Sequence, residues 1–151
     1  MRTIVLLLAS GFGTGYSPIA SGTVGSALAA LLYWFVFPKN YLIVFLISVA
    51  AFIISIPVST EAEKIYGKKD DSHIVIDEIV GFWISVLFLP YSFKILIAAF
   101  FLFRLFDVIK PFYIRNAQKL PGGWGVVMDD IFAGILTNMI LQIAVRIFHL
   151  A

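Results

Sequence analysis

Long apolar runs, separated by short polar segments, make up most of the chain. The runs are continuously apolar and do not alternate with polar residues, so they predict helices and disfavour the strands of a membrane barrel. At the N-terminus we expect a short helix, which resembles a buried or interfacial helix more than a cleaved signal peptide. Longer helices are expected at 22–37, 41–58, 73–89, 93–109 and 126–149.

Glycine, proline and polar residues place the boundaries between these helices. The segment 11–26 is rich in glycine and serine and predicts a structured loop, and 38–40 and 90–92 predict turns. The polar sequence STEAEK should begin as an extension of the second helix, and Ser72 is the expected N-cap of the third. Pro111 should end the fourth helix, because proline cannot continue it.

The composition is that of a membrane protein. Hydrophobic residues make up 61% of the 151 residues and charged residues 13%, whereas soluble domains are about 45–50% apolar and about 25% charged. We therefore expect an all-α fold, a small polytopic membrane helical bundle of about four to five hydrophobic helices with a short N-terminal helix. It should form a single domain over 1–151. The runs are short for spans of about 20 residues, so tilt or local thinning must compensate.

Net charge and cysteine content exclude several classes of function. The net charge of +2 is too small to indicate a nucleic-acid partner. The sequence contains no cysteine, which excludes disulfides, zinc–thiolate sites and cysteine nucleophiles.

The distribution of charge predicts one polar side of the bundle. Five spanning helices would place 1–21, 59–73 and 110–125 together on one side. That side carries most of the basic residues, namely Arg2, Lys64, Lys68, Lys69, Lys110, Arg115 and Lys119, and the positive-inside rule makes it cytoplasmic. All nine acidic residues lie on it or within about two turns of it. We therefore expect one site at the cytoplasmic face.

Three stretches place charged residues in apolar surroundings, where an ionised side chain is costly without a partner or a function. The first contains Asp70 and, about one turn into the third helix, Asp77 and Glu78. A simple favourable interaction with the positive end of the helix dipole is one explanation for the last two. Glu78, Gly81 and Ser85 share a helix face, whose small residues would let another helix approach closely.

The second and third stretches repeat this situation. In the fourth helix Arg104, Asp107 and Lys110 are spaced so that they can pair with one another or face a polar site. In the fifth helix Asp129 and Asp130 lie in the first turn, where the dipole again offers a simple explanation. A small and polar stripe of this helix should face into the bundle, formed by Asp130, Ala133, Gly134, Thr137 and Asn138.

Taken together, the three stretches indicate a metal-dependent phosphate site. Up to five carboxylates and the basic side chains of Arg104, Lys110 and Arg115 fall at one interfacial depth. Oxygen ligands without clusters of histidine or cysteine suit Mg²⁺ or Mn²⁺. At such sites the metal neutralises phosphoryl oxygens and activates water, while Arg and Lys bind the remaining charge.

Two smaller features have two explanations each. The segment 22–26 enters a helix with free backbone N–H groups and the hydroxyls of Thr23 and Ser26, which suits an anion, but its small residues suit helix packing equally well. His73 lies beside Asp71 and can act as an acid or base, or simply cap the helix start. Asp71 itself is expected to be solvated.

Four motifs together resemble the phosphatidylglycerophosphatase A family. They are SPIASGTVGS (17–26), DDSHIVIDEIVG (70–81), FRLFDVIKP (103–111) and GGWGVVMDDIFAG (122–134). They occur in the family's order and spacing and span nearly the whole chain. Ser21 departs from the pattern, because proline is expected at its position.

The resemblance implies a membrane enzyme that uses Mg²⁺ to remove the terminal phosphate of phosphatidylglycerophosphate, in phosphatidylglycerol and cardiolipin biosynthesis. The lipid substrate would be bound in the bilayer of a bacterial cytoplasmic (inner) membrane, at its cytoplasmic face.

The implied catalytic candidates are Asp77, Glu78, Asp107, Asp129 and Asp130. The candidate metal ligands are Asp70, Asp77, Glu78, Asp129 and Asp130. The candidates for substrate binding are Thr23, Ser26, Arg104 and Lys110. Arg115 is a further candidate because of its basic charge. Which carboxylate serves as base, nucleophile or metal ligand stays open, and so does an aspartyl-phosphate intermediate.

Two other classes of function are alternatives. A small ion- or proton-coupled transporter subunit would line a pathway with buried charges. Such a pathway needs polar groups through the membrane midplane, where the apolar runs carry almost none. A non-catalytic lipid-binding protein would use the basic loop 110–119, but interleaved acidic residues make the polar side a poor polybasic patch.

Overall fold

The computed structural model describes residues 2–111, 116–117 and 119–149. These residues contain six α-helices of defined bounds, one short 3-10 helix and no strand, which confirms the all-α prediction. The helices are α1 (Arg2–Ala9), η1 (Thr14–Tyr16), α2 (Ser21–Phe35), α3 (Tyr41–Tyr66), α4 (Ile76–Ser85), α5 (Phe93–Ile109) and α7 (Gly123–Phe148). Of these, α3 and α7 are long and apolar enough to cross a membrane, judged by length and composition.

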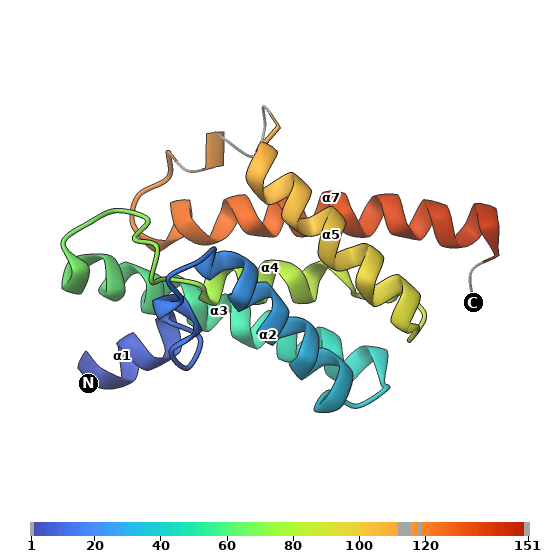
Figure 1. Ribbon diagram of the computed structural model, residues 1–151, viewed down its shortest axis with the longest axis horizontal. Coiled ribbons are helices and arrows are strands. Elements are labelled where there is room, and N and C mark those ends of the chain that lie inside the picture. The colour runs from blue at the N-terminus through green and yellow to red at the C-terminus, as the bar shows by residue number, and fades with distance from the viewer. Residues whose placement is uncertain (1, 112–115, 118, 150–151) are drawn as a thin grey trace.

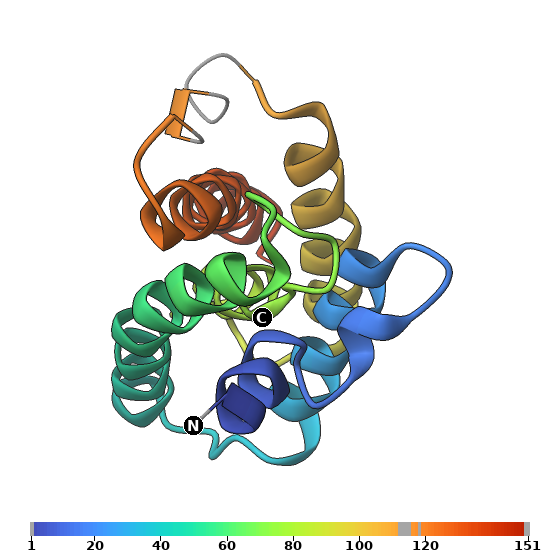
Figure 2. The ribbon, with the colours of Figure 1, turned by 90° about the vertical axis from the view of Figure 1, so that its left-hand side faces the viewer.

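The short helix α4 lies at the centre of the molecule. The end-on view in Figure 2 shows α2, α3, α5 and α7 arranged around it, and α4 contacts all four. Val80 and Phe82 of α4 are completely buried. The helix that carries Asp77 and Glu78 is therefore the axis of the bundle, although it is one of the shortest.

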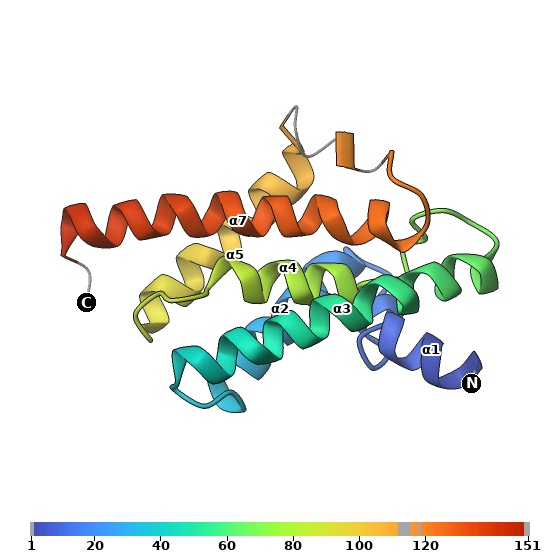
Figure 3. The ribbon, with the colours of Figure 1, turned by 180° about the vertical axis from the view of Figure 1, so that it is seen from behind.

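The two long helices run along the long axis of the molecule. Figure 3 shows α3 and α7 running beside α4, and Figure 1 shows α2 and α5 on the opposite side, with α1 near one end of the long axis. Within their most apolar stretches, only 22% of α3 and 28% of α7 is buried. Apolar helices with so much exposed surface favour a lipid environment over water.

Three of the expected helices are found close to their predicted bounds. α5 spans the predicted residues, and α2 starts one residue earlier than expected and ends two earlier. α3 includes the extension STEAEK and ends at Tyr66. The next residue, Gly67, has the left-handed conformation (φ 69°) that commonly follows a helix. At the start of α3 the side chain of Asn40 accepts hydrogen bonds from the backbone N–H groups of Leu42 and Ile43.

The start of α4 differs from the prediction, because Ser72 is not its N-cap and 73–75 are not helical. The N–H of Val75 donates to the carbonyl of Ala9 (2.8 Å), and the N–H of His73 donates to the carboxylate of Asp71 (3.1 Å). A local side-chain turn and a distant backbone partner thus take the N–H groups that a longer helix would use.

The end of α4 is also early, and it lies inside the bundle. Carbonyls at a helix end need partners when they are buried. Asn138 of α7 donates to the carbonyls of Ser85 (3.1 Å) and Leu87 (2.8 Å), and Gln142 donates to Leu87 as well (3.2 Å). Side chains of α7 therefore stabilise a helix end where the prediction continued the helix to Leu89.

The start of α7 comes earlier than the predicted Val126. The N–H of Gly123 donates to the hydroxyl of Thr60 in α3 (2.9 Å). A Cβ atom at Gly123 would collide with the backbone carbonyl of Ile56. Glycine thus lets the first turn of α7 lie directly against α3, and a glycine-rich segment expected to be a loop becomes helical.

Candidate active site

Three carboxylates from two helices form a compact group. Asp77 and Glu78 lie in the first turn of α4, and Asp130 lies in α7. One oxygen of each lies within 4.8 Å of one oxygen of each of the others. Asp77 and Asp130 are buried, at 5% and 2% exposure. We call these three residues the acidic cluster.

The acidic cluster fits a divalent cation. Oxygens Oδ1 of Asp77 and Oε2 of Glu78 are buried and have no hydrogen-bond partner. Buried carboxylates that repel one another are costly unless a positive charge balances them. Three hard oxygen ligands at this spacing are what Mg²⁺, Mn²⁺ or Ca²⁺ prefer. The donor set and the unpartnered oxygens together support a metal site at this position.

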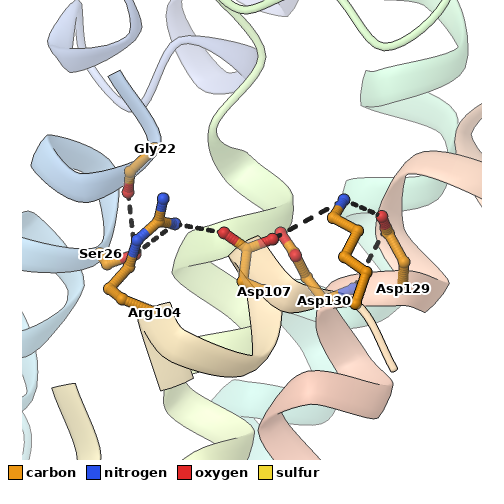
Figure 4. Close-up of polar contacts among 7 residues, drawn as sticks. Gly22, Ser26, Arg104, Asp107, Asp129 and Asp130 are labelled. Carbon is orange, nitrogen blue, oxygen red and sulfur yellow. Dashed lines mark hydrogen bonds and ion pairs between the residues drawn. The ribbon is translucent and has the colours of Figure 1, made fainter. Parts of the chain in front are cut away.

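A chain of ion pairs runs beside the acidic cluster (Figure 4). Nη1 of Arg104 lies 2.6 Å from Oδ2 of Asp107, and Nζ of Lys110 lies 3.7 Å from Oδ1 of the same residue. Nζ of Lys110 also lies 2.5 Å from Oδ2 of Asp129. We call these four residues, Arg104, Asp107, Lys110 and Asp129, the charged chain. It joins the end of α5 to the start of α7.

The first two turns of α2 hold one end of the charged chain. The hydroxyl of Ser26 donates to the carbonyl of Gly22 (2.8 Å) and accepts from Nη1 of Arg104 (3.5 Å). A Cβ atom at Gly22 would collide with Oε1 of Glu78 and would lie 3.1 Å from Nη1 of Arg104. Glu78 and Arg104 therefore both lie against Gly22, and a larger residue there would displace them.

The other end of the charged chain is at Lys110, just beyond α5. Burial alone would lower the pKa of Lys110, but the carboxylates around it, chiefly that of Asp129, outweigh burial and raise this pKa. The ammonium group therefore stays charged. The backbone of Lys110 is left-handed (φ 43°), an uncommon conformation for a residue other than glycine.

The acidic cluster and part of the charged chain line one cleft of about 330 Å³. It contains the carboxylates of the cluster together with Asp107 and Lys110. The rest of its lining is formed by Ser21, Asp70, Asp71, Ser72, Ile74 and Val108. Acidic oxygens and the ammonium group of Lys110 thus line the same space, as the binding of a phosphate group together with a cation requires.

One wall of the cleft is held by a cluster of aromatic and charged side chains. Nδ1 of His73 lies 2.5 Å from Oδ1 of Asp71, and the imidazole stacks on the ring of Tyr66. The hydroxyls of Tyr66 and Tyr16 are 2.8 Å apart. Burial would raise the pKa of Asp71, but the backbone N–H and the imidazole of His73 outweigh it and lower this pKa. Asp71 is therefore an ionised, paired carboxylate and not the solvated one that was expected.

Comparison with known proteins identifies the family of this chain. The family model described as phosphatidylglycerophosphatase A matches residues 7–145. The chain belongs to the phosphatidylglycerophosphatase A family. The matched segment includes the whole acidic cluster and the whole charged chain. No solved structure matches the chain.

Three curated proteins are similar to most of the chain. A Bacteroides thetaiotaomicron protein with the provisional name phosphatidylinositol-3-phosphatase is 37% identical over 150 residues, which are 92% of this chain and 92% of the relative. Proteins named phosphatidylglycerophosphatase A from Escherichia coli and Haemophilus influenzae are 37% and 36% identical. Each covers 89% of this chain, and the aligned parts are 80% and 85% of the two relatives.

Most of the site residues expected from the family resemblance lie close together. Asp77, Glu78, Asp130, Asp107 and Lys110 line the cleft. Asp70 also lines the cleft but is exposed and does not belong to the acidic cluster.

Five other expected site residues lie differently from the cleft-lining group. Arg104 pairs with Asp107 and contacts Ser26, and it is not among the residues that line the cleft. Asp129 contacts Lys110 and is not part of the acidic cluster. The hydroxyl of Ser26 contacts Arg104, while Thr23 is partly buried and does not line the cleft. Arg115 lies outside the described residues.

The family resemblance did not indicate the contributions of Ser21 and Ser72. The hydroxyl of Ser21, which stands where proline was expected, donates to the carbonyl of Ser72 (2.7 Å). This bond ties the start of α2 to the segment before α4, and both residues line the cleft. Nothing in the local sequence signals it, because the two residues are far apart in the chain.

Proposed function

We propose that this protein is a Mg²⁺-dependent lipid phosphatase that hydrolyses phosphatidylglycerophosphate to phosphatidylglycerol and phosphate, in phosphatidylglycerol and cardiolipin biosynthesis. The observation that supports it is the acidic cluster beside Lys110 in one cleft of a phosphatidylglycerophosphatase A family member. The family to which the chain belongs and the names of two relatives indicate the same reaction.

The acidic cluster would hold the metal. Asp77, Glu78 and Asp130 supply its oxygens, and exposed Asp70 at the cleft supplies a further carboxylate. Asp129 would support the metal site indirectly by holding Lys110. A bound Mg²⁺ would neutralise phosphoryl oxygens and lower the pKa of a bound water.

The phosphate of the substrate would bind to Arg104 and Lys110. Nε of Arg104 is buried without a partner, so the guanidinium keeps a donor for a phosphate oxygen. Asp107 contacts both basic residues and holds them at a fixed separation. Ser26 acts in this scheme by positioning Arg104.

Hydrolysis requires one proton to leave water and one to reach the leaving oxygen. Water bonds to phosphorus as it gives a proton to a carboxylate of the cleft, and the bond between phosphorus and the glycerol oxygen breaks. The released glycerol oxygen takes a proton from solvent in the cleft. Direct attack by Asp77 or Asp130, followed by hydrolysis of an aspartyl-phosphate, would use the same residues.

We also propose that the chain is one domain, 1–151, and spans a bacterial inner membrane as a polytopic bundle with its cleft at the cytoplasmic face. The exposed apolar surfaces of α3 and α7 support a lipid environment. Basic residues gather at the end of the molecule that carries the cleft, which supports its cytoplasmic orientation. The charges near the cleft do not extend along the bundle, so the transporter alternative is not favoured.

Two lipids are candidate substrates, and their hydrolysis can be compared directly. One relative bears the name of a phosphatidylinositol-3-phosphatase, and both candidate substrates present a phosphomonoester at a lipid headgroup. The family model and the other two relatives favour phosphatidylglycerophosphate.

The test is phosphate release by the purified protein in detergent, from each of the two lipids, with Mg²⁺ and with EDTA. We expect Mg²⁺-dependent release, faster from phosphatidylglycerophosphate. The Asp77→Asn variant, purified in the same way, controls for a contaminating phosphatase. Absence of metal-dependent release from either lipid would reject the enzyme function, and a preference for the inositol lipid would reject the proposed substrate.

A further inference from the structure

An apolar groove of about 320 Å³ lies between α2 and α5, away from the cleft. Its lining residues are all apolar, and they include Ala27, Ala30 and Trp34 of α2 and Phe93, Ile97 and Phe100 of α5. The two helices lie side by side in both Figure 1 and Figure 2. The stacking of Trp34 on Tyr91 (centroids 4.6 Å apart) fixes one wall of the groove.

One end of the groove lies next to the contact between Ser26 and Arg104. Ser26, which contacts Arg104, directly precedes Ala27 at one end of the groove. Arg104 itself lies one helical turn beyond Phe100 on the same side of α5. The contact between Ser26 and Arg104 thus separates a polar cleft from an apolar groove along the same pair of helices.

The length of the groove matches one leaflet of a bilayer. At 1.5 Å per residue, Phe93 and Arg104 are about 16 Å apart along α5. Half of a hydrocarbon core is about 15 Å thick. A lipid whose phosphate reached Arg104 would therefore have room for a chain alongside Phe100, Ile97 and Phe93.

We propose that this groove binds one acyl chain of the lipid phosphomonoester substrate. The proposal rests on the proposed function, because the phosphate at Arg104 and the chain in the groove belong to the same molecule. The side chains at Ala27 and Ala30 are small, which leaves room for a chain beside α2 where it would leave the polar site. Binding there would fix the headgroup relative to the acidic cluster.

The first test fills the groove. Ala27→Phe should lower kcat/KM for dioleoyl-phosphatidylglycerophosphate by about tenfold, the loss expected when roughly two methylene groups are kept out of an apolar site. The deacylated headgroup, glycerophosphoglycerophosphate, has no chain to enter the groove, so its kcat/KM should stay within about twofold of wild type. The matched control is Ala98→Phe, an exposed α5 residue that lines a separate groove between α5 and α7.

The outcomes of this test separate the groove from the reaction. Equal losses on the lipid and on its deacylated headgroup, or no loss on either, would overturn the groove while leaving the hydrolytic function intact. Absence of hydrolysis by the wild-type protein would reject the function itself, and the binding measurement then decides the groove.

The binding measurement uses Trp34 as a reporter inside the groove. In a Trp83→Phe/Trp124→Phe background, phosphatidylglycerophosphate with brominated chains, present at a low mole fraction in vesicles of unlabelled lipid, should quench Trp34 saturably. Phosphatidylglycerol with the same brominated chains should quench it less, and Ala27→Phe should remove the difference. Equal quenching by the two lipids would show that ordinary bilayer lipid occupies the groove and would overturn the proposal.

Discussion

Gly81 of α4 lies directly against the backbone of Asp130 in α7, since a Cβ atom at Gly81 would be 2.7 Å from the Asp130 carbonyl oxygen. A Cβ atom at Gly134 would in turn collide with the carbonyl of Gly81. Two glycines therefore let α4 and α7 touch through their backbones. Because Asp77 and Glu78 lie one turn before Gly81, this contact brings their carboxylates to Asp130.

The first prediction concerns this contact. Gly81→Ala should separate α4 from α7, destabilise the fold by about 1–3 kcal/mol through overpacking, and weaken Mg²⁺ activation because the acidic cluster opens. The measurements are the Tm in detergent and the Mg²⁺ concentration for half-maximal activity. Ala98→Val, which adds bulk on an exposed face of α5, should change neither. Unchanged Mg²⁺ activation in a folded Gly81→Ala protein would contradict the prediction.

The second prediction concerns the metal. A cation bound only to the folded protein should stabilise it by about 2.7 kcal/mol at one hundred times its Kd, so EDTA should lower Tm and Mg²⁺ should restore it. Asp130→Asn removes one ligand and should weaken binding about 100-fold or more, so its Tm should respond little to Mg²⁺. Asp71→Asn is the control, because Asp71 pairs with His73 and lies outside the acidic cluster. An equal Mg²⁺ response in both variants would place the metal elsewhere.

Local sequence patterns predicted the helices and the convergence of the acidic stretches. Contacts between distant segments could not be predicted from such patterns. Pro111 and the apolar run before it are sufficient to place α5. The small stripe around Gly134 correctly indicated which face of α7 enters the bundle. The late start of α4 depends on a bond from Val75 to Ala9, which no local pattern contains.

The roles of Asp129 and Asp130 show the same limit. Neighbouring helical residues point about 100° apart, so the sequence implies that the two carboxylates face different surroundings. Only the packing of α7 against its neighbours decides their partners: Asp129 meets Lys110 at the end of α5, and Asp130 meets Asp77 of α4. Ser26 was likewise expected to bind substrate, and its contact with Arg104 depends on how α2 meets α5.

The third prediction concerns Lys110 and Asp129. Lys110→Met leaves the carboxylate of Asp129, which is only 3% exposed, without this cation and should cost about 3–5 kcal/mol of folding free energy. The double variant Lys110→Met/Asp129→Asn should recover part of that loss but should stay inactive, because the phosphate-binding ammonium is missing. Denaturation in detergent of the wild type, Lys110→Met, Asp129→Asn and the double variant measures the coupling energy between the two residues.

A surface pair provides the control for this cycle. Lys64 and Glu61 lie equally close (2.5 Å) but are largely exposed. Lys64→Met should therefore change stability by no more than about 1 kcal/mol. Strict additivity of the two variants at Lys110 and Asp129 would mean that the buried pair does not act as a unit.

The fourth prediction concerns orientation in the membrane. The chain contains no cysteine, so single cysteines report sidedness without background. Lys64→Cys near the cleft end of α3 should react with an impermeant maleimide only in inside-out vesicles, and Lys39→Cys at the opposite end only in intact cells. Labelling in the reverse pattern would invert the orientation, and labelling of both from one side would mean that α3 does not span the bilayer.

The last prediction concerns the buried end of α4. Asn138→Leu removes both hydrogen bonds from its amide and leaves the carbonyl of Ser85 without its donor from α7. The expected cost is about 1–3 kcal/mol of folding free energy, the penalty for burying an unpaired polar group. Gln142→Leu should cost less, because Leu87 keeps its bond from Asn138. Both variants should keep their response to Mg²⁺ when folded, since neither residue contributes to the acidic cluster. Equal Tm values for the two variants would mean that the end of α4 is stabilised by other contacts, and the central helix would then be held chiefly by its glycine contact with α7.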